Sequence, residues 1–208
     1  MQGIVGVYSH KEASTKNHYI LYGVQHRGQE SSGVTAASNH SLRTWKGKGL
    51  ISNVLDEKYA AFTHPDDYVI IGAASGENSN NGYTPIECRE HPRYVFSLAL
   101  DGFFPDRNGP NEYVIKKTIL EYLDTGLEIV EALKEAMRRH RDAYYSLVMA
   151  VWDREAEKSL LLAARDERGI RPLYMARSED SFYFASESAP IDVLENTGEV
   201  FTERADVI

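Results

Sequence analysis

The sequence has little of what defines several large classes of protein. Among 208 residues there is one cysteine, Cys88, which excludes a disulfide framework within the chain. No apolar run approaches the roughly 18 residues that a membrane-spanning helix needs. The opening Met-Gln-Gly-Ile-Val-Gly lacks the basic region that precedes the apolar part of a secretory signal. We therefore expect a reduced, cytoplasmic protein without a membrane partner.

Positive charge is also scarce. The chain has 23 Lys and Arg against 31 Asp and Glu, a net charge of −8. A nucleic-acid binder needs a basic excess to displace counterions, so we expect no nucleic-acid partner. With 42% hydrophobic and 26% charged residues, the composition is typical of a globular protein. At roughly 150 residues per domain, the length predicts a single domain over residues 1–208.

Short stretches rich in β-branched and aromatic residues, bounded by Gly, Pro, Asp or Asn, predict strands. Several are apolar throughout, which is typical of strands covered on both faces. The predicted strands are Ile4–Tyr8, Gly33–Ala37, Leu42–Lys46, Tyr68–Ala73, Tyr94–Leu100, Tyr145–Trp152, Ser159–Ala163, Leu173–Arg177 and Phe182–Ala185.

Helical spacing of apolar residues occurs in three segments. In the first, Tyr19 and Tyr22 share one side. The predicted helices are His18–Gln25, Glu112–Leu123 and Glu128–Arg141. Polar stretches at 75–81, 87–91 and 101–110 predict loops. Strands, then a helical pair, then strands again indicate two sheets faced by helices.

Four blocks of sequence carry a more specific signal. They are Leu21–Val34, Gly47–Ser52, Ala163–Leu173 and Ala185–Ser188. In this order and at these spacings they resemble the glutaminase domain of amidophosphoribosyltransferase, a class II glutamine amidotransferase. The resemblance runs from Gln2 to about Leu194. It implies an α+β fold of the N-terminal-nucleophile hydrolase type: a four-layer αββα sandwich with two stacked antiparallel sheets, in agreement with the strand and helix pattern.

The family's catalytic residues, however, are replaced. Family members begin Met-Cys-Gly, and removal of Met leaves a cysteine whose own α-amine is the base for its thiol. This chain has Gln2 at that position. A carboxamide has no nucleophilic lone pair at neutral pH, so Gln2 cannot form the thioester intermediate.

The substrate-binding positions implied by the resemblance differ as well. Ser75 stands where the family has the arginine that clamps the glutamine carboxylate. The oxyanion hole is an Asn side chain and the following Gly in the family, and here those positions are Asp101 and Gly102. The aspartate that holds the substrate amine is missing near residues 109–112.

These replacements indicate a degenerate family member, with no catalytic residue assigned and Gln2, Ser75, Asp101 and Gly102 as the altered positions. We interpret the chain as a protein without glutaminase activity that binds or regulates in purine or nitrogen metabolism. The phosphoribosyltransferase domain that follows in the family is not expected in this chain.

Candidate ligand-binding residues lie beside the family's glutamine pocket: His26, Arg27, Asn78 and Asp101. A retained pocket arginine can serve another anion, so the expected partner is a small molecule, either a purine intermediate or an amino acid, or else a protein. The sequence also permits a homo-oligomer. We expect no cofactor and no metal.

Two other interpretations stay open. The fold is similar to that of archaeal IMP cyclohydrolases, so the same cavity could perform ring closure on a purine nucleotide, with Arg27 as phosphate anchor, Asp101 as acid or base and Asn78–Asn81 as polar contacts. Alternatively, a rearranged glutaminase site could use Cys88 as its nucleophile. Arg165, Asp166 and Arg171 could form a buried ion-pair lattice that fixes the loop before Pro172, and Glu187 could cap or pair nearby. The sequence favours this structural role for Arg165, Asp166 and Glu187.

Overall fold

The computed structural model of the protein describes residues 1–38, 40–56, 59, 62–76, 86–105 and 111–195. Strands form most of its regular structure. They are β1 (Gln2–Ser9), β2 (Ser31–Ala37), β3 (Leu42–Lys48), β4 (Val69–Ser75), β5 (Glu87–Glu90), β6 (Tyr94–Phe103), β7 (Tyr144–Asp153), β8 (Lys158–Arg165), β9 (Tyr174–Arg177) and β10 (Ser181–Ala185).

Helices make up the rest of the regular structure that is described. They are α1 (Ala13–Gly23), the 3-10 turn η1 (Gln25–Arg27), α2 (Ile51–Val54), α4 (Asn111–Leu123), α5 (Ile129–Arg139) and α6 (Ala189–Glu195). In the described part, no helix is long and apolar enough to cross a membrane.

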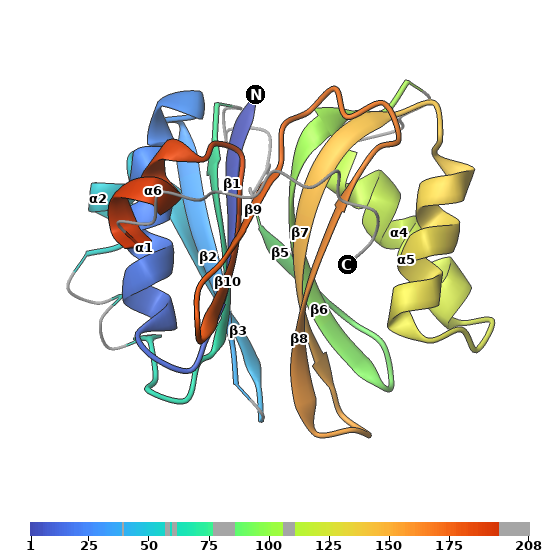
Figure 1. The fold of residues 1–208 in the computed structure, drawn as a ribbon. Coiled ribbons are helices and arrows are strands. Elements are labelled where there is room, and N and C mark those ends of the chain that lie inside the picture. Colours follow the sequence, from blue (N-terminus) through green and yellow to red (C-terminus); the bar gives the residue numbers. More distant parts are fainter. Residues whose placement is uncertain (39, 57–58, 60–61, 77–85, 106–110, 196–208) are drawn as a thin grey trace.

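Two antiparallel sheets lie face to face, with helices on both outer faces (Figure 1). The six-stranded sheet has the order β3-β2-β4-β1-β10-β9, and the four-stranded sheet has the order β5-β6-β7-β8. Helices α1, α2 and α6 cover the first sheet, and α4 and α5 cover the second (Figure 1). This is the αββα sandwich predicted from the resemblance.

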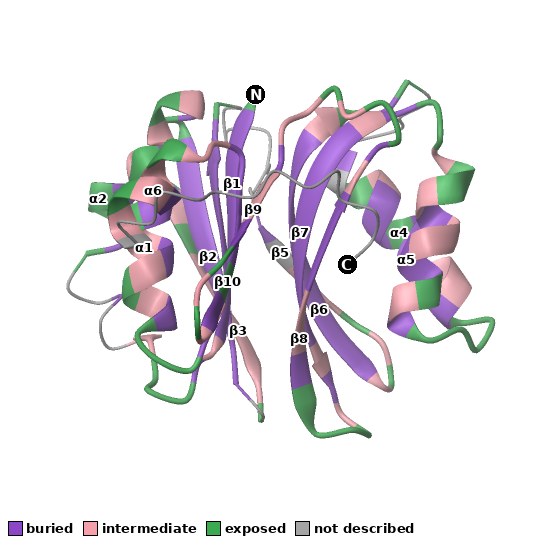
Figure 2. Ribbon diagram, in the orientation of Figure 1, coloured by how far each residue is buried: buried purple, intermediate pink, exposed green. Residues whose placement is uncertain are grey.

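Three hydrophobic clusters fill the spaces between these layers. Ile20 and Val34 belong to the cluster beneath α1, α2 and α6, whereas Ile119 and Leu133 belong to the cluster beneath α4 and α5. The third cluster, which includes Ile4, lies between the two sheets. Both faces of the central strands are therefore buried (Figure 2), and this explains their unbroken apolar sequences.

Each predicted strand coincides with an observed one, but the loop predicted at 87–91 is wrong, because Glu87–Glu90 forms β5. This short strand pairs only with β6 in the described sheet, where Glu90 is opposite Val95. Charged residues are common on edge strands because they discourage pairing with another chain. The charge that suggested a loop is thus compatible with a strand at this position.

Helix α1 also differs from its prediction. It begins at Ala13 and buries Asn17 and Ile20, whereas Tyr19 and Tyr22 are 61% and 57% exposed. The Asn17 side chain donates a hydrogen bond to the Ile70 carbonyl at 3.2 Å, so a polar residue takes a buried position. Apolar spacing alone therefore predicted the wrong face. The helices predicted at 112–123 and 128–141 match α4 and α5 within two residues.

A histidine at the end of α5 makes stability dependent on pH. The His140 ring packs against Phe104 with a centroid distance of 5.3 Å, and its Nε2 lies 2.8 Å from Thr118 Oγ1. Burial, with a smaller contribution from Arg139, lowers the pKa of His140 below its ordinary value of 6.5. The unfolded chain then binds more protons than the folded chain as the pH falls through 6.5. Burial lowers the pKa of His18 in the same direction.

We therefore expect the free energy of unfolding to decrease as the pH falls from about 7.5 to 5.5, a range above the titration of most carboxylates. His140→Gln removes one of the two contributing groups, so its decrease over this range should be smaller but not abolished. Urea unfolding at several pH values measures both slopes. Equal slopes in the two proteins would contradict the assignment to His140.

Candidate functional site

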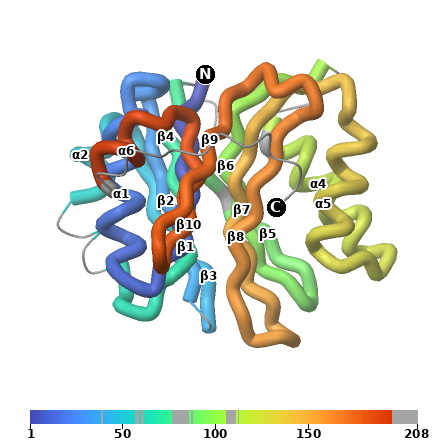
Figure 3. Tube along the Cα trace, in the orientation of Figure 1, coloured from blue at the N-terminus to red at the C-terminus, as the bar shows by residue number. Residues whose placement is uncertain are grey.

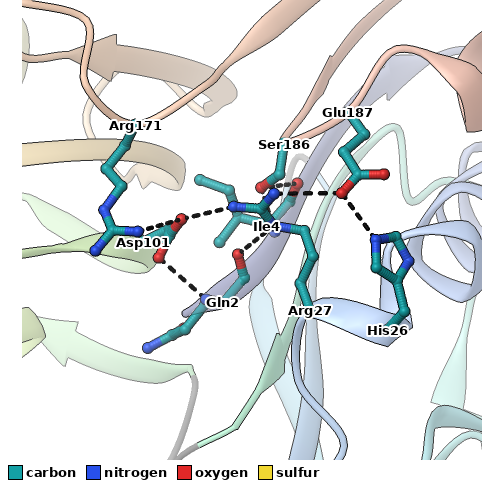
Figure 4. A network of polar contacts seen from close by, with 8 residues as sticks. All are labelled: Gln2, Ile4, His26, Arg27, Asp101, Arg171, Ser186 and Glu187. Carbon is teal, nitrogen blue, oxygen red and sulfur yellow. Dashed lines mark hydrogen bonds and ion pairs between the residues drawn. The ribbon is translucent and has the colours of Figure 1, made fainter.

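At the end of the sandwich that holds the N-terminus, six residues from different parts of the chain form one network of polar contacts (Figure 4). The N-terminal residue of β1, the end of β6, η1 and the loop after β10 meet here, together with the connection between β8 and β9 (Figure 3). We call this network the Asp101 cluster. Its members are Gln2, His26, Arg27, Asp101, Arg171 and Glu187.

Asp101 is the buried carboxylate at the centre of the cluster, with a side chain only 2% exposed. Its Oδ1 accepts a hydrogen bond from the Gln2 backbone N–H at 3.0 Å. Its Oδ2 lies 3.0 Å from Arg27 Nη2 and 3.9 Å from Arg171 Nη1. A buried carboxylate needs such compensation, because removing the charge from water is costly.

Arg27 donates to three acceptors at once. Its Nε donates to the Gln2 carbonyl at 3.0 Å, Nη1 to Glu187 Oε1 at 3.2 Å and Nη2 to Asp101. The arginine side chain is 10% exposed. Its guanidinium therefore joins η1 to β1, β6 and the loop after β10, with the planar donor arrangement that only arginine has.

The outer part of the cluster is more open to solvent. His26 Nε2 lies 2.9 Å from Glu187 Oε1, and the two side chains are 62% and 31% exposed. Ser186, next to Glu187, exchanges hydrogen bonds with β1: the Ile4 N–H donates to Ser186 Oγ at 2.9 Å, and the Ser186 N–H donates to the Ile4 carbonyl at 3.0 Å. The loop that carries Glu187 is thereby fixed to the first strand.

Tight backbone packing positions Ser75 and Arg27. Gln2 is opposite Ser75 in the β1–β4 ladder, and Ser75 is fully buried. Gly28, directly after Arg27, touches the same backbone: a Cβ at Gly28 would lie 2.3 Å from the Ser75 carbonyl carbon. Only glycine fits at this crossing, so the glycine that follows Arg27 sets how closely η1 approaches β4.

The structure brings Gln2, Arg27 and Asp101 together, and His26 joins them through Glu187. Gln2 takes part through its backbone, as Figure 4 shows. Asn78 lies outside the described residues. Gly102 has a packing role, because a Cβ there would lie 2.5 Å from the Tyr145 Cβ.

The predicted ion pairs around Asp166 are wrong in detail. Asp166 accepts hydrogen bonds from the backbone N–H groups of Tyr145 and Arg168, each at 3.0 Å, whereas Arg171 faces Asp101. The Arg165 guanidinium lies against Gly169, whose φ is +62°. Arg171 was therefore missed as part of the cluster. The family block that contains Arg171 could be recognised from the sequence, but the sequence did not indicate that Arg171 faces Asp101 in β6.

The environment of Cys88 does not favour a nucleophile. Its Sγ lies 2.9 Å from Thr44 Oγ1, and burial raises the pKa of the thiol, which keeps it protonated at neutral pH. Cys88 is opposite Ser97 in the β5–β6 ladder, four residues before Asp101 along β6. Among the described residues, no group of three or more His, Cys, Asp or Glu side chains is arranged to hold a metal ion.

Comparison with known proteins agrees with this geometry. The family model of a glutamine amidotransferase domain matches residues 120–193. Amidophosphoribosyltransferase 3 of Arabidopsis thaliana is 31% identical over 95% of this chain and 38% of its own length. The amidophosphoribosyltransferase of Staphylococcus aureus is 26% identical over 92% of this chain and 41% of its own length. The chain thus spans about two fifths of these curated relatives.

Solved structures show the same fold. The glutamine phosphoribosylpyrophosphate amidotransferase of B. subtilis, complexed with ADP and GMP, has a TM-score of 0.70 at 21% identity, over 93% of this chain and 43% of that one. A structure described as the allosteric regulatory enzyme of purine biosynthesis has a TM-score of 0.73 at the same identity and coverage.

The chain is therefore related to the class II glutamine amidotransferases. Within this class its relatives are the glutaminase domains of amidophosphoribosyltransferases.

The Arg27–Asp101 pair generates a stability prediction. Arg27→Met leaves the Asp101 carboxylate buried without its nearest cation, and we expect a loss of about 3–5 kcal/mol in the free energy of unfolding. Arg27→Met/Asp101→Asn removes both charges and should recover most of this loss. Urea unfolding at neutral pH measures all three proteins. A single variant as stable as the original protein would show that the pair does not compensate Asp101.

A second prediction concerns the glycine crossing. Gly28→Ala forces the Ser75 backbone to move, so we expect a loss of about 1–3 kcal/mol. Gly76→Ala is the matched control, since its Cβ would lie 3.6 Å from its nearest neighbour, the Met1 carbonyl oxygen, which is an ordinary contact. Thermal unfolding of the two variants checks the difference. A Gly28→Ala protein no less stable than Gly76→Ala would refute the close approach.

Proposed function

We propose that this chain does not hydrolyse glutamine and that it acts as a binding or regulatory protein in purine or nitrogen metabolism. The observation that carries the proposal is the Asp101 carboxylate, bound to the Gln2 backbone N–H and paired with Arg27. The positions that the family uses for nucleophile and oxyanion hole are here bonded to each other.

The nucleophilic step has no supporting group at the start of β1. Gln2 carries a neutral carboxamide, which cannot attack the glutamine amide carbon and leave as a thiolate does. Its backbone N–H donates to Asp101 and its carbonyl accepts from Arg27. Both backbone groups thus hold the cluster together.

Stabilisation of a tetrahedral intermediate is also opposed. An oxyanion needs hydrogen-bond donors aimed at it, and loss of one donor costs about 10²–10³ in rate. Asp101 places a carboxylate at this position, and an ionised carboxylate has hydrogen-bond acceptors but no donor. A second negative charge next to this buried carboxylate would be repelled.

Recognition of the glutamine carboxylate loses its cation. Ser75 replaces the arginine that the resemblance implies, and it lies fully buried between Gln2 of β1 and Ser31 of β2. A short neutral side chain within a sheet cannot form the bidentate pair that an arginine makes with a carboxylate. Affinity and orientation of free glutamine are therefore both reduced.

The pathway part of the proposal comes from the relatives. They are named amidophosphoribosyltransferases, and one similar structure is described as a regulatory enzyme of purine biosynthesis. We propose that the chain binds a purine intermediate, an amino acid or a protein of this metabolism, as a monomer or with a second copy. The ring-closure alternative gains no support, because Arg27 already donates to three protein acceptors and is not free to anchor a phosphate.

Glutamate release from glutamine is the direct test. The purified chain at millimolar glutamine should release no glutamate above a blank without protein, and Gln2→Ala should behave identically. Release by the original protein that disappears in Gln2→Ala would overturn the proposal. Release that disappears in Cys88→Ser instead would support the rearranged site at Cys88.

Thermal unfolding with added ligands tests the binding part. A ligand at 100 times its Kd adds about 2.7 kcal/mol of stability, which raises the Tm by a few degrees for a domain of this size. We expect no shift with glutamine and a shift with at least one purine intermediate or other amino acid. A panel without any shift would favour a protein as the partner.

A further inference from the structure

The opposite end of the sandwich contains a cavity of about 520 Å³ that the Asp101 cluster does not reach. Strand β1 runs from Gln2 to Ser9, a span of about 23 Å at 3.3 Å per residue, and the cavity lies where this strand ends. Its lining residues include Tyr8 of β1, Tyr68 before β4 and Lys158 at the start of β8. The start of β8 lies at the lower end in Figure 1. The volume of the cavity is within the range of small-molecule sites, about 300–1,000 Å³.

Aromatic rings from three neighbouring positions form its wall. The rings of Tyr8 and Tyr68 are 5.8 Å apart at an interplanar angle of 75°, and the His10 ring lies 5.6 Å from that of Tyr68. Two rings at such an angle make a corner that presents one face and one edge. Flat aromatic molecules favour both contacts, since the face of a ring is negative and its edge positive.

Hydrogen bonds hold these rings in place. The Tyr8 hydroxyl lies 2.9 Å from His10 Nε2. Burial raises the pKa of Tyr68, so that its phenol stays neutral. Ser159, on the cavity wall, donates to the Ser38 carbonyl at 2.6 Å and thereby joins the two sheets. These contacts restrict the side chains of the wall, which lowers the entropy cost of binding.

The rim carries a cation that forms no ion pair with any described residue. Lys158 is exposed at the mouth of the cavity, and among the lining residues the carboxylate of Asp66 follows His64, whose Nδ1 accepts a hydrogen bond from the Asp66 backbone N–H at 3.3 Å. An ammonium without a partner at the mouth of an aromatic pocket attracts an anionic group. Lys158 therefore offers one positive charge to an anionic group at this mouth, in a chain whose net charge is −8.

We propose that this cavity binds a small molecule that has a flat aromatic ring and one anionic group. The ring lies in the corner between Tyr8 and Tyr68, and the anion faces Lys158. This site is independent of the proposed function, because it uses none of the residues of the Asp101 cluster. A nucleoside monophosphate and an aromatic carboxylate share the required chemistry, and the probes below distinguish them.

Calorimetric titration with matched probes tests the proposal. AMP and indole-3-acetate each carry a ring and an anion, adenosine and indole-3-acetamide carry the ring alone, and ribose 5-phosphate carries the anion alone. We expect at least one of the two ring-plus-anion probes to bind at least tenfold more tightly than its neutral counterpart and than ribose 5-phosphate. The better of the two identifies the type of anion.

Variants locate the binding. Lys158→Gln is a surface change that leaves the fold intact, and it should weaken the anionic probe at least fivefold while leaving its neutral counterpart unchanged. Lys117→Gln, a similarly exposed lysine on α4, is the control and should have no effect. Tyr68→Leu should weaken charged and neutral probes alike.

Three results would overturn the proposal: no heat from any probe up to millimolar concentration, neither AMP nor indole-3-acetate binding more tightly than ribose 5-phosphate and its own neutral counterpart, or affinities that Lys158→Gln and Tyr68→Leu leave unchanged. The last result, combined with loss of binding in Arg27→Met/Asp101→Asn, would place the ligand at the Asp101 cluster instead.

Discussion

A carboxylate as deeply buried as that of Asp101 needs a cation, and the Arg27 guanidinium supplies it at 3.0 Å. The remaining donors of the same guanidinium bind the backbone of Gln2 and the carboxylate of Glu187. One ion pair thus determines how the first strand, the turn after α1, the end of β6 and the loop after β10 meet. The pair thus makes this end of the sandwich an internally bonded junction.

Much of the fold could be predicted from local patterns. Unbroken apolar runs such as residues 69–74 of β4 are typical of strands covered on both faces, and the two sheets with their helical layers provide that cover. Patterns failed where a polar residue takes a core position. Asn17 is buried because its side chain donates a hydrogen bond to the Ile70 carbonyl of β4, and Tyr19 and Tyr22 consequently point to solvent. The edge strand β5 was not predicted, because its charged sequence resembles that of a loop.

The candidate site was less accessible from the sequence. Gln2, Arg27 and Asp101 could be named because the resemblance assigns family positions to them, but their mutual bonding depends on segments that are distant in the chain. Arg171 and Ser186 join through loops whose course no local pattern specifies. The aromatic cavity had no sequence signal, because Tyr8 and Tyr68 are brought together only by the pairing of β1 with β4.

The reciprocal hydrogen bonds between Ile4 and Ser186 join residues separated by 182 positions. Strand β1 occupies the middle of its sheet, between β4 and β10, although it is the first strand of the chain. During synthesis this strand leaves the ribosome long before β10 exists, and one of its two edges has no partner until then. The long segment between β1 and β10 must be closed into a loop before their pairing can stabilise the sheet. Completion of this sheet is therefore expected to be a late and slow step of folding.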